Sequence, residues 1–382
     1  MDSSNPVQDQ SPTSPGPPPI SRRGLLAASA ALGLSACARS IPAAPIPYVD
    51  GLSFLPQDLS DIGRAGLHAF ICDVAEEMEV KDPDGLVRYV RTFDLCNRSL
   101  DAATARLAQS PSAYVGKRGS DIGKRQGAAI FLQFQSCEPI EDDLGRIAYF
   151  HGKGLRLLQI THHNNNLFGG GAIERVPSGL TKLGVEGVAE MNRVGIIPDV
   201  SHASEATALD VGRITRTPFV LSHGACEAIV NHPRCASDAV IRSIADKGGV
   251  MGIFMMSFWL TRDPVPGIAH LLAQFRHVIK VGGIESVGIA NDFDMAGHQR
   301  LAALANDNAE GVKDYHDWWR ANHRRGVAGF EELPRHVVIP ELNRIDRMKI
   351  IHASLDRAGF KSGAIEKIMG GNWIRVLEEV LG

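Results

Sequence analysis

The stretch IIPDVSHASEATALDVGRITRTPFVLSH, residues 196–223, holds one complete unit of the pattern that decides the fold. Within it, IIPDVS (196–201) predicts a short buried strand, residues 205–215 predict a helix, and PFVLS (218–222) predicts the next strand. A helix between two such strands indicates a crossover connection that leaves the strands parallel and adjacent. Each of the two predicted strands runs directly into a histidine.

The same alternation of strands and helices continues on both sides of this unit. With so many units in a row, a closed (β/α)8 TIM barrel is the most natural α/β arrangement, and an open doubly wound sheet is the alternative. The glycine fingerprint of nucleotide-binding open sheets is absent from the sequence, which favours the barrel. We therefore predict a single barrel domain over residues 38–382. The further predicted strands are 128–134, 155–160, 249–256 and 286–291, and the further predicted helices are 141–154, 185–195, 238–247 and 268–283.

The composition of the 382-residue chain is that of a globular protein, with 44% hydrophobic and 22% charged residues. Its formal net charge of −3 offers no electrostatic attraction to nucleic acid. Beyond the N-terminal region, no apolar stretch approaches the roughly 20 residues that a membrane-spanning helix requires. These totals exclude a polytopic membrane protein and a collagen, and they argue against a nucleic-acid partner.

Residues 1–37 look like an export signal rather than part of the folded domain. A polar tail is followed by the pair Arg22-Arg23 and by the small apolar run AASAALGLSA (27–36), the order found in twin-arginine signals. The run ends at Cys37 in a sequence that resembles a bacterial lipobox, in which the cysteine is lipidated. The alternative is a cleaved signal with an incidental cysteine. We expect a periplasmic or membrane-anchored protein that contacts the membrane only through this lipid.

Polar side chains follow four of the predicted strands, at the point where each strand ends. The carboxyl ends of barrel strands meet at one face, so we expect these side chains to lie together there. Converging neutral imidazoles are usual ligands of zinc or a similar divalent ion, whereas a lone histidine is more often a hydrogen-bonded residue near the core. His163 is expected to point away from the site if its neighbour points into it. The four strand-end residues are His162, His202, His223 and Asp292.

Six segments of the chain, in their order and spacing, resemble the membrane (renal) dipeptidase family. The resemblance implies a metal-dependent barrel hydrolase with a binuclear zinc site that cleaves dipeptides, and it also suggests a homodimer. The segments are VDGLSFLP (49–56), GLRLLQITHHN (154–164), GLTKLGVEGVAEMNRVGIIPDVSHAS (179–204), PFVLSHGACEAI (218–229), VGIANDFD (287–294) and GGNWIRVLEEV (370–380).

The resemblance also implies a role for each candidate site residue. His202 and His223 match two ligands of one zinc ion, and His162 matches the residue that polarises the scissile carbonyl or its oxyanion. Asp292 matches the acid/base that handles the proton of the attacking water. Arg234 matches the group that binds the C-terminal carboxylate of the substrate, which suits the rigid fork of a guanidinium. A solvated surface arginine is the alternative for Arg234.

Three positions depart from the family pattern. The family's first strand ends in a D-G-H-x-D signature whose His and Asp bind the other zinc, and this chain has Leu52 and Phe54 in those places. The glutamate that bridges both metals corresponds to Gln135. Because Leu and Phe cannot ligate and a neutral amide bridges two cations poorly, we expect at most one weakly held zinc ion. Gln135, Asp292 or Glu138 could complete the shell of that ion.

Three functions therefore remain open. The chain could hydrolyse dipeptides with a reduced, single-metal site, or act with altered chemistry on a small amide- or carboxylate-bearing molecule, or bind such a ligand as a non-catalytic lipoprotein. Metal content and dipeptide hydrolysis measured on one sample separate the first function from the others. Residues 296–340 form a polar, loop-rich insertion that could be a lid, an oligomer contact or a solvated surface segment.

Overall fold

The computed structural model describes residues 46–81 and 87–382. The predicted export signal, with Arg22, Arg23 and Cys37, lies outside these described residues. Among the residues that are described, no helix is both long enough and apolar enough to cross a membrane.

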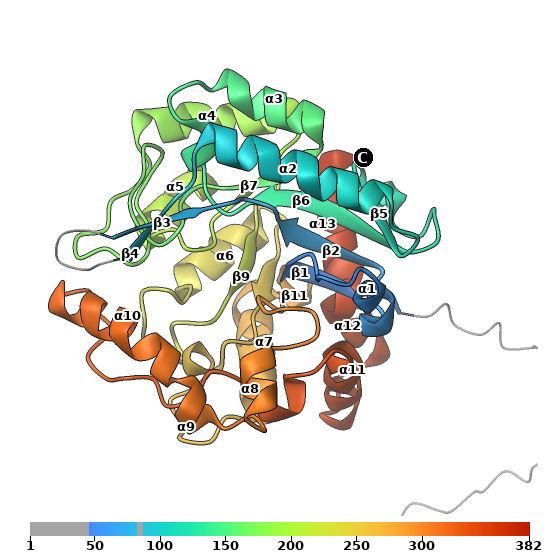
Figure 1. The fold of residues 1–382 in the computed structure, drawn as a ribbon, viewed down its shortest axis with the longest axis vertical. Coiled ribbons are helices and arrows are strands. Elements are labelled where there is room, and N and C mark those ends of the chain that lie inside the picture. Colours follow the sequence, from blue (N-terminus) through green and yellow to red (C-terminus); the bar gives the residue numbers. More distant parts are fainter. Residues whose placement is uncertain (1–45, 82–86) are drawn as a thin grey trace, which may run out of the picture. The chain divides into compact units, whose positions relative to one another are not determined.

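In the described part of the chain, eight parallel strands form the wall of a barrel (Figure 1), and a further short strand, β5 (Ala113–Val115), pairs in parallel with β6. The barrel strands are β1 (Val49–Ser53), β2 (Ala69–Asp73), β6 (Ala128–Phe134), β7 (Leu155–Gln159), β8 (Ile197–Asp199), β9 (Leu221–Gly224), β10 (Met251–Ile253) and β11 (Val287–Ile289). The first five pair in this order as one sheet, and the last three form a second sheet. A bridge between Asp199 and Val220 joins the two sheets on one side. On the other side the Asp292 N–H donates to the Leu52 carbonyl oxygen, which confirms the closed barrel over the open sheet.

Helices lie around the outside of these strands (Figure 1). The helices that follow successive barrel strands are amphipathic, and each packs its apolar face on the strands. In α6, for example, Val240, Ile241 and Ile244 are buried. The helix predicted to end on a glycine does so at Gly195, which has a φ of 85°. The helices are α1 (Ser60–Ala65), α2 (Phe93–Ala108), α3 (Gly145–Lys153), α4 (Lys182–Val194), α5 (Glu205–Ile214), α6 (Asp238–Asp246), α7 (Ile268–Gly282), α11 (Arg347–Arg357), α12 (Ser362–Glu366) and α13 (Asn372–Leu381).

The strand expected at 218–222 begins later, at Leu221, so His223 lies within β9 rather than after it. The polar, loop-rich segment 296–340 also contains three helices, α8 (Gln299–Ala303), α9 (Asn308–Gly311) and α10 (Lys313–Arg324). Only a few side chains of helix α10, among them Trp319, are buried. Most of its side chains face solvent, which is consistent with its polar sequence.

The N-terminal end of the barrel is closed by the last helix, α13. Val376, Leu377 and Trp373 of this helix pack against inward-facing apolar residues of the strands, such as Val49, Phe131 and Leu157. The Trp373 indole N–H donates a 3.1 Å hydrogen bond to the Ile289 carbonyl oxygen. At the start of this helix, the Asn372 side-chain amide donates to the carbonyl oxygens of Ile284 and Val287. This packing leaves the opposite, carboxyl end of the strands free to carry the site.

Candidate active site

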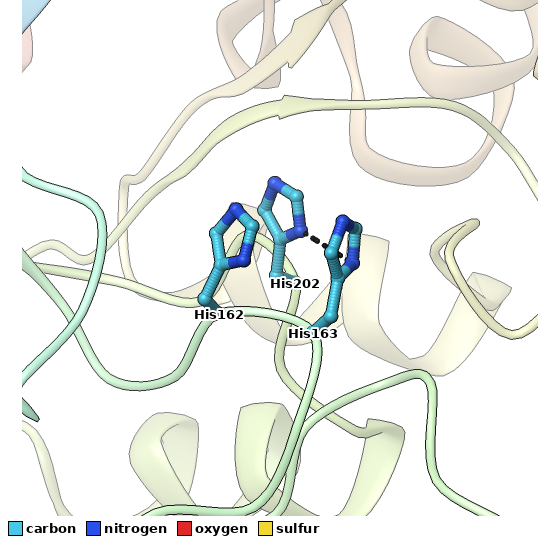
Figure 2. Close-up of side chains that lie close together, drawn as sticks. All are labelled: His162, His163 and His202. Atoms are coloured by element: carbon cyan, nitrogen blue, oxygen red, sulfur yellow. Dashed lines mark hydrogen bonds between the residues drawn. The ribbon is translucent and has the colours of Figure 1, made fainter. Parts of the chain in front are cut away.

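Three histidines meet at the carboxyl ends of β7 and β8. His162 and His163 lie in a bend just after β7, and His202 follows β8. One ring nitrogen of each histidine lies within 4.8 Å of one ring nitrogen of each of the other two (Figure 2). The rings of His162 and His202 are stacked, with centroids 4.2 Å apart. We call these three residues the histidine cluster.

The inclusion of His163 corrects the prediction that it points away from its neighbour. Consecutive side chains alternate in direction only in an extended strand. Residues 160–164 form bends instead, so both imidazoles turn to the same side. His163 Nδ1 lies 3.0 Å from His202 Nδ1, a contact drawn as a dashed line in Figure 2.

His223 joins the cluster through His202, as the sequence predicted for these two neighbouring strands. The Nε2 atoms of the two imidazoles are 2.7 Å apart. Burial, with the positive charge of Arg234, holds the pKa of both His202 and His223 well below the usual range. Both rings are therefore neutral, the state in which imidazole ligates a metal. His202 has a φ of 59°, a conformation that non-glycine residues mostly adopt where the structure enforces it.

Two carboxylates at the ends of barrel strands face the same cavity. Asp292 follows β11 with a φ of 52°, and burial raises its pKa to about 7, while the charge of Arg234 opposes the shift. Asp73 is the last residue of β2 and accepts hydrogen bonds from the backbone N–H groups of Ala75 and Gln135, at 3.1 and 3.2 Å. Burial raises the pKa of Asp73 to about 6. Sequence analysis missed Asp73, although the strand AFICD (69–73) ends on it.

The cavity at this end of the barrel has a volume of about 850 Å³. Polar groups occupy its base, and an aromatic and apolar wall contributed partly by the 296–340 segment forms its side. The polar residues at the base are Asp73, Gln135, His162, His163, His202 and Asp292, and the wall includes Phe54, Met256, Phe258, Trp259, Tyr315 and Trp318. Further polar and charged residues that line the cavity are Glu77, Tyr89, Arg91, Asp314, Asp317 and Arg324.

Arg234 lies behind this wall rather than among the residues that line the cavity. The Cζ atom of its guanidinium lies over two aromatic rings, 5.3 Å from the centroid of Phe254 and 5.6 Å from that of Trp259. One Nη donates a 3.2 Å hydrogen bond to the His223 carbonyl oxygen, and burial lowers the pKa of the guanidinium to about 10. The surface-arginine alternative is wrong, because only 3% of Arg234 is exposed.

Two metal ions do not fit the residues at this site. The fully buried Leu52 and the Phe54 ring offer no ligand atom, and Gln135 offers only a neutral amide. The carboxylate of Glu138 lies 3.5 Å from the guanidinium of Arg91, so its charge is already engaged. The histidine cluster offers donor atoms for one ion, because one ring nitrogen from each of its three imidazoles lies within 4.8 Å of the others.

A closed parallel barrel with histidines and carboxylates at the carboxyl ends of its strands is the architecture of metal-dependent barrel hydrolases. Residues 74–317 match the sequence profile of the membrane dipeptidases, Peptidase family M19. The chain belongs to this family.

Curated relatives agree with this assignment. The chain is 31% identical to the dipeptidase tcpJ of Claviceps purpurea over 297 residues, which cover 75% of this chain and 59% of that protein. It is 34% identical to the dipeptidase verJ of Clonostachys rogersoniana over 172 residues, which cover 44% of this chain and 43% of the relative. The chain thus spans only about half the length of these relatives.

Solved structures share the whole fold. An amidohydrolase from Pseudomonas aeruginosa superposes with a TM-score of 0.71 at 26% identity, over 88% of this chain and 97% of the other. A metallo peptidase from Rhodobacter sphaeroides, liganded with a phosphinate mimic of L-Ala-D-Ala, has a TM-score of 0.68 at 18% identity, over 88% and 99% of the two chains. At 18% identity the second likeness shows the fold alone.

Proposed function

We propose that this chain hydrolyses a small dipeptide-like amide in the cavity at the carboxyl ends of its barrel strands. The observation that carries the proposal is the convergence of imidazoles and carboxylates from four strand ends on one cavity. His162 comes from the end of β7, His202 from β8, Asp292 from β11 and Asp73 from β2. Membership of the membrane dipeptidase family supports the same reaction class.

The reaction needs a base that accepts the proton of the attacking water and an acid that returns a proton to the leaving amine. We assign both tasks to Asp292, because a carboxyl with a pKa of about 7 exchanges its proton readily at neutral pH. His162, at the base of the cavity, is assigned to donate a hydrogen bond to the oxygen of the scissile carbonyl. A divalent cation held by His163 and His202 of the histidine cluster would supply Lewis acidity toward this carbonyl and would lower the pKa of water.

The cavity indicates the kind of substrate. A volume of about 850 Å³ accommodates a dipeptide-sized molecule, and the wall of Phe258, Trp259 and Trp318 favours an apolar or aromatic side chain on it. Arg91 and Arg324 line the cavity and offer guanidinium groups to a free carboxylate on the substrate, whereas Arg234, to which the family resemblance gives this role, lies behind the wall.

The proposal is tested by hydrolysis of a dipeptide panel and of the matching N-acyl amino acids, with Zn²⁺ or Co²⁺ added to metal-free protein. We expect turnover that is greatest for substrates with an apolar or aromatic residue, and loss of turnover in Asp292→Asn. Binding of dipeptides without any turnover would overturn the proposal and would favour the non-catalytic ligand-binding lipoprotein.

We also propose that the protein is exported and held at the membrane by a lipid on Cys37. The support is the order of Arg22-Arg23, the apolar run and the lipobox-like cysteine in the sequence. Fractionation of cells that express the full chain tests this proposal. Wild type is expected with the membranes, Cys37→Ala in the soluble periplasmic fraction, and Arg22→Lys/Arg23→Lys in the cytoplasm. A wild-type protein that stays in the cytoplasm would contradict it.

A further inference from the structure

A second large cavity lies on the outside of the barrel and shares no lining residue with the candidate active site. It is a groove of about 770 Å³ between the last turns of α2, strand β5 and the segment that leads to β6. We call it the basic groove, because four exposed basic residues of this segment line it. They are Lys117, Arg118, Lys124 and Arg125.

The basic groove carries an excess of positive charge. Asp121 is the only acidic residue among the described residues that line it. Its carboxylate accepts hydrogen bonds from the backbone N–H groups of Lys117 and Arg118, at 2.9 and 3.0 Å, and lies 3.7 Å from the ammonium nitrogen of Lys124. Within the described part of the chain, no carboxylate pairs with the side chains of Lys117, Arg118 or Arg125. Their positive charges are therefore available to a bound anion.

The groove combines the two kinds of side chain that a phospholipid headgroup needs. Ammonium and guanidinium groups donate hydrogen bonds to phosphate oxygens, and a guanidinium can do so with two N–H groups at once. Tyr114 and Leu107 also line the groove, and the Tyr114 ring centroid lies 5.5 Å from Cζ of Arg125. A phosphate that carries glycerol and the start of an acyl chain would contact both kinds.

The basic groove lies at the amino end of the barrel, where α2 ends and β6 begins. Its segment packs on α13, the helix that closes this end, and the Ser120 hydroxyl donates a 3.3 Å hydrogen bond to the Gly382 carbonyl oxygen. The described chain also begins here, because β1 starts at Val49 and the Pro47 carbonyl oxygen lies next to Gly370, just before α13. Figure 1 shows α13 and β5 on the side away from α10, which borders the active-site cavity.

A lipid on Cys37 would keep this end of the barrel near the membrane. Residues 38–45 separate Cys37 from Ile46, and a chain of that length spans at most about 30 Å. Such a tether gives weak contacts between the domain and the lipid surface a high effective concentration. A basic patch beside a lipid anchor is a known second signal for stable membrane attachment.

We propose that the basic groove binds the headgroups of anionic phospholipids, with the amino end of the barrel on the membrane and the active-site cavity opening away from it. The cellular setting rests on the proposed lipid anchor, whereas the affinity of the groove for anionic vesicles does not. Each Lys or Arg side chain close to an anionic surface strengthens binding about 5-fold, so the four together contribute on the order of 10²- to 10³-fold.

The test is co-sedimentation of the full chain carrying Cys37→Ala, which cannot be lipidated, with vesicles of phosphatidylcholine alone or mixed with phosphatidylglycerol. We expect stronger binding to the anionic vesicles, and release from them at about 0.5 M salt. Adding Lys117→Gln, Arg118→Gln, Lys124→Gln and Arg125→Gln should weaken binding to the anionic vesicles about 10²-fold or more. Adding only Lys117→Gln/Arg118→Gln should weaken it about 25-fold.

The matched control adds Arg300→Gln/Lys313→Gln/Arg320→Gln/Arg335→Gln, which removes the same charge from exposed residues of the 296–340 segment. It should bind as the Cys37→Ala chain does. All of these variants keep the same N-terminal region, so any binding by that region is equal in each. Hydrogen exchange on the anionic vesicles reports the orientation, because residues 117–126 should exchange more slowly while α10 stays unchanged.

The proposal is overturned if the fourfold groove variant binds anionic vesicles as well as the Cys37→Ala chain does, if the control loses as much binding, or if exchange slows at α10 instead. Inorganic phosphate that binds in calorimetry while anionic vesicles do not would indicate a free-anion site and would also overturn it. Fractionation of wild type separates the two proposals. Vesicle binding by a protein that stays in the cytoplasm removes the lipid anchor only, and a membrane-anchored wild type whose groove variant keeps its vesicle binding removes the groove only.

Discussion

The backbone N–H of Asp292 donates a 3.0 Å hydrogen bond to the carbonyl oxygen of Leu52. This bond ties the end of β1 to the residue after β11 and so helps to close the barrel at the site. Position 52 contributes through its backbone, which any side chain provides. The family's histidine can therefore be absent here without loss of barrel closure, and the proposed acid/base residue keeps its place.

Asp292→Asn should lower kcat/KM about 10²- to 10⁴-fold, because an amide can neither accept nor return the proton. Binding of Co²⁺ to the histidine cluster should remain, since the proposed ligands are untouched. Asp294→Asn is the control, because Asp294 is exposed two residues further along. An Asp292→Asn enzyme with nearly wild-type kcat/KM would exclude Asp292 as the acid/base.

Because of Asp50, the free energy of unfolding should fall as the pH rises from about 4 to about 7. Burial raises the pKa of this carboxyl from 3.8 to about 7, although the Asn291 and Leu52 donors oppose the shift. In that window the folded chain holds a proton that the unfolded chain has lost, so the free energy of unfolding falls with pH, by at most about 4 kcal/mol.

Asp50→Asn removes this contribution. The difference in unfolding free energy between wild type and variant, from urea titrations at pH 4 to 8, should shrink with pH and level off above about 7. Asp142→Asn, at an exposed position, is the matched control for the substitution. A pH-independent difference for Asp50→Asn would show that its carboxyl is ionised throughout.

Trp318 and Trp319 should respond differently to replacement by alanine. Trp318 lines the cavity with its ring 5.5 Å from that of His163, so Trp318→Ala should raise KM severalfold and leave kcat largely unchanged. Trp319 is 1% exposed and packs on Phe330 and Phe258, so Trp319→Ala should cost about 3–5 kcal/mol of stability. Equal effects on KM would remove the substrate-contacting role of Trp318.

The regular part of the barrel could be predicted from the sequence because each strand–helix unit has its own apolar pattern. The strand predicted at 128–134 is β6 to the residue, and the placement of His202 and His223 on neighbouring strands follows from one such unit. The first barrel strand was expected only through the family resemblance and β2 was not predicted, because short α1 and the antiparallel β3 (Met78–Lys81) and β4 (Val87–Val90) interrupt the alternation there. Asp73 was missed for that reason.

The contacts of His163 and Asp199 depend on features that a sequence pattern does not contain. His163 turns into the cluster because residues 160–164 bend, and the bend direction follows from contacts made after the chain folds. Asp199 meets Ser222 only because β8 and β9 lie side by side in one register. A strand pattern gives the order of neighbours, but not which hydroxyl faces which carboxylate.

Restoring the family's ligand types should restore a second metal ion. In the variant Leu52→His/Phe54→Asp/Gln135→Glu, an imidazole and two carboxylates stand where the family holds its other zinc, and the Leu52 backbone bonds to Asp50 and Asp292 do not depend on the side chain. The zinc content of the Zn²⁺-loaded protein, measured by elemental analysis, should rise from one ion per chain to two. Gln135→Glu alone should stay at one, because Leu52 and Phe54 still stand where the family holds two ligands of its other zinc. A triple variant that is folded by circular dichroism yet binds no more Zn²⁺ than wild type would show that the three substitutions are not what limits the site to a single ion.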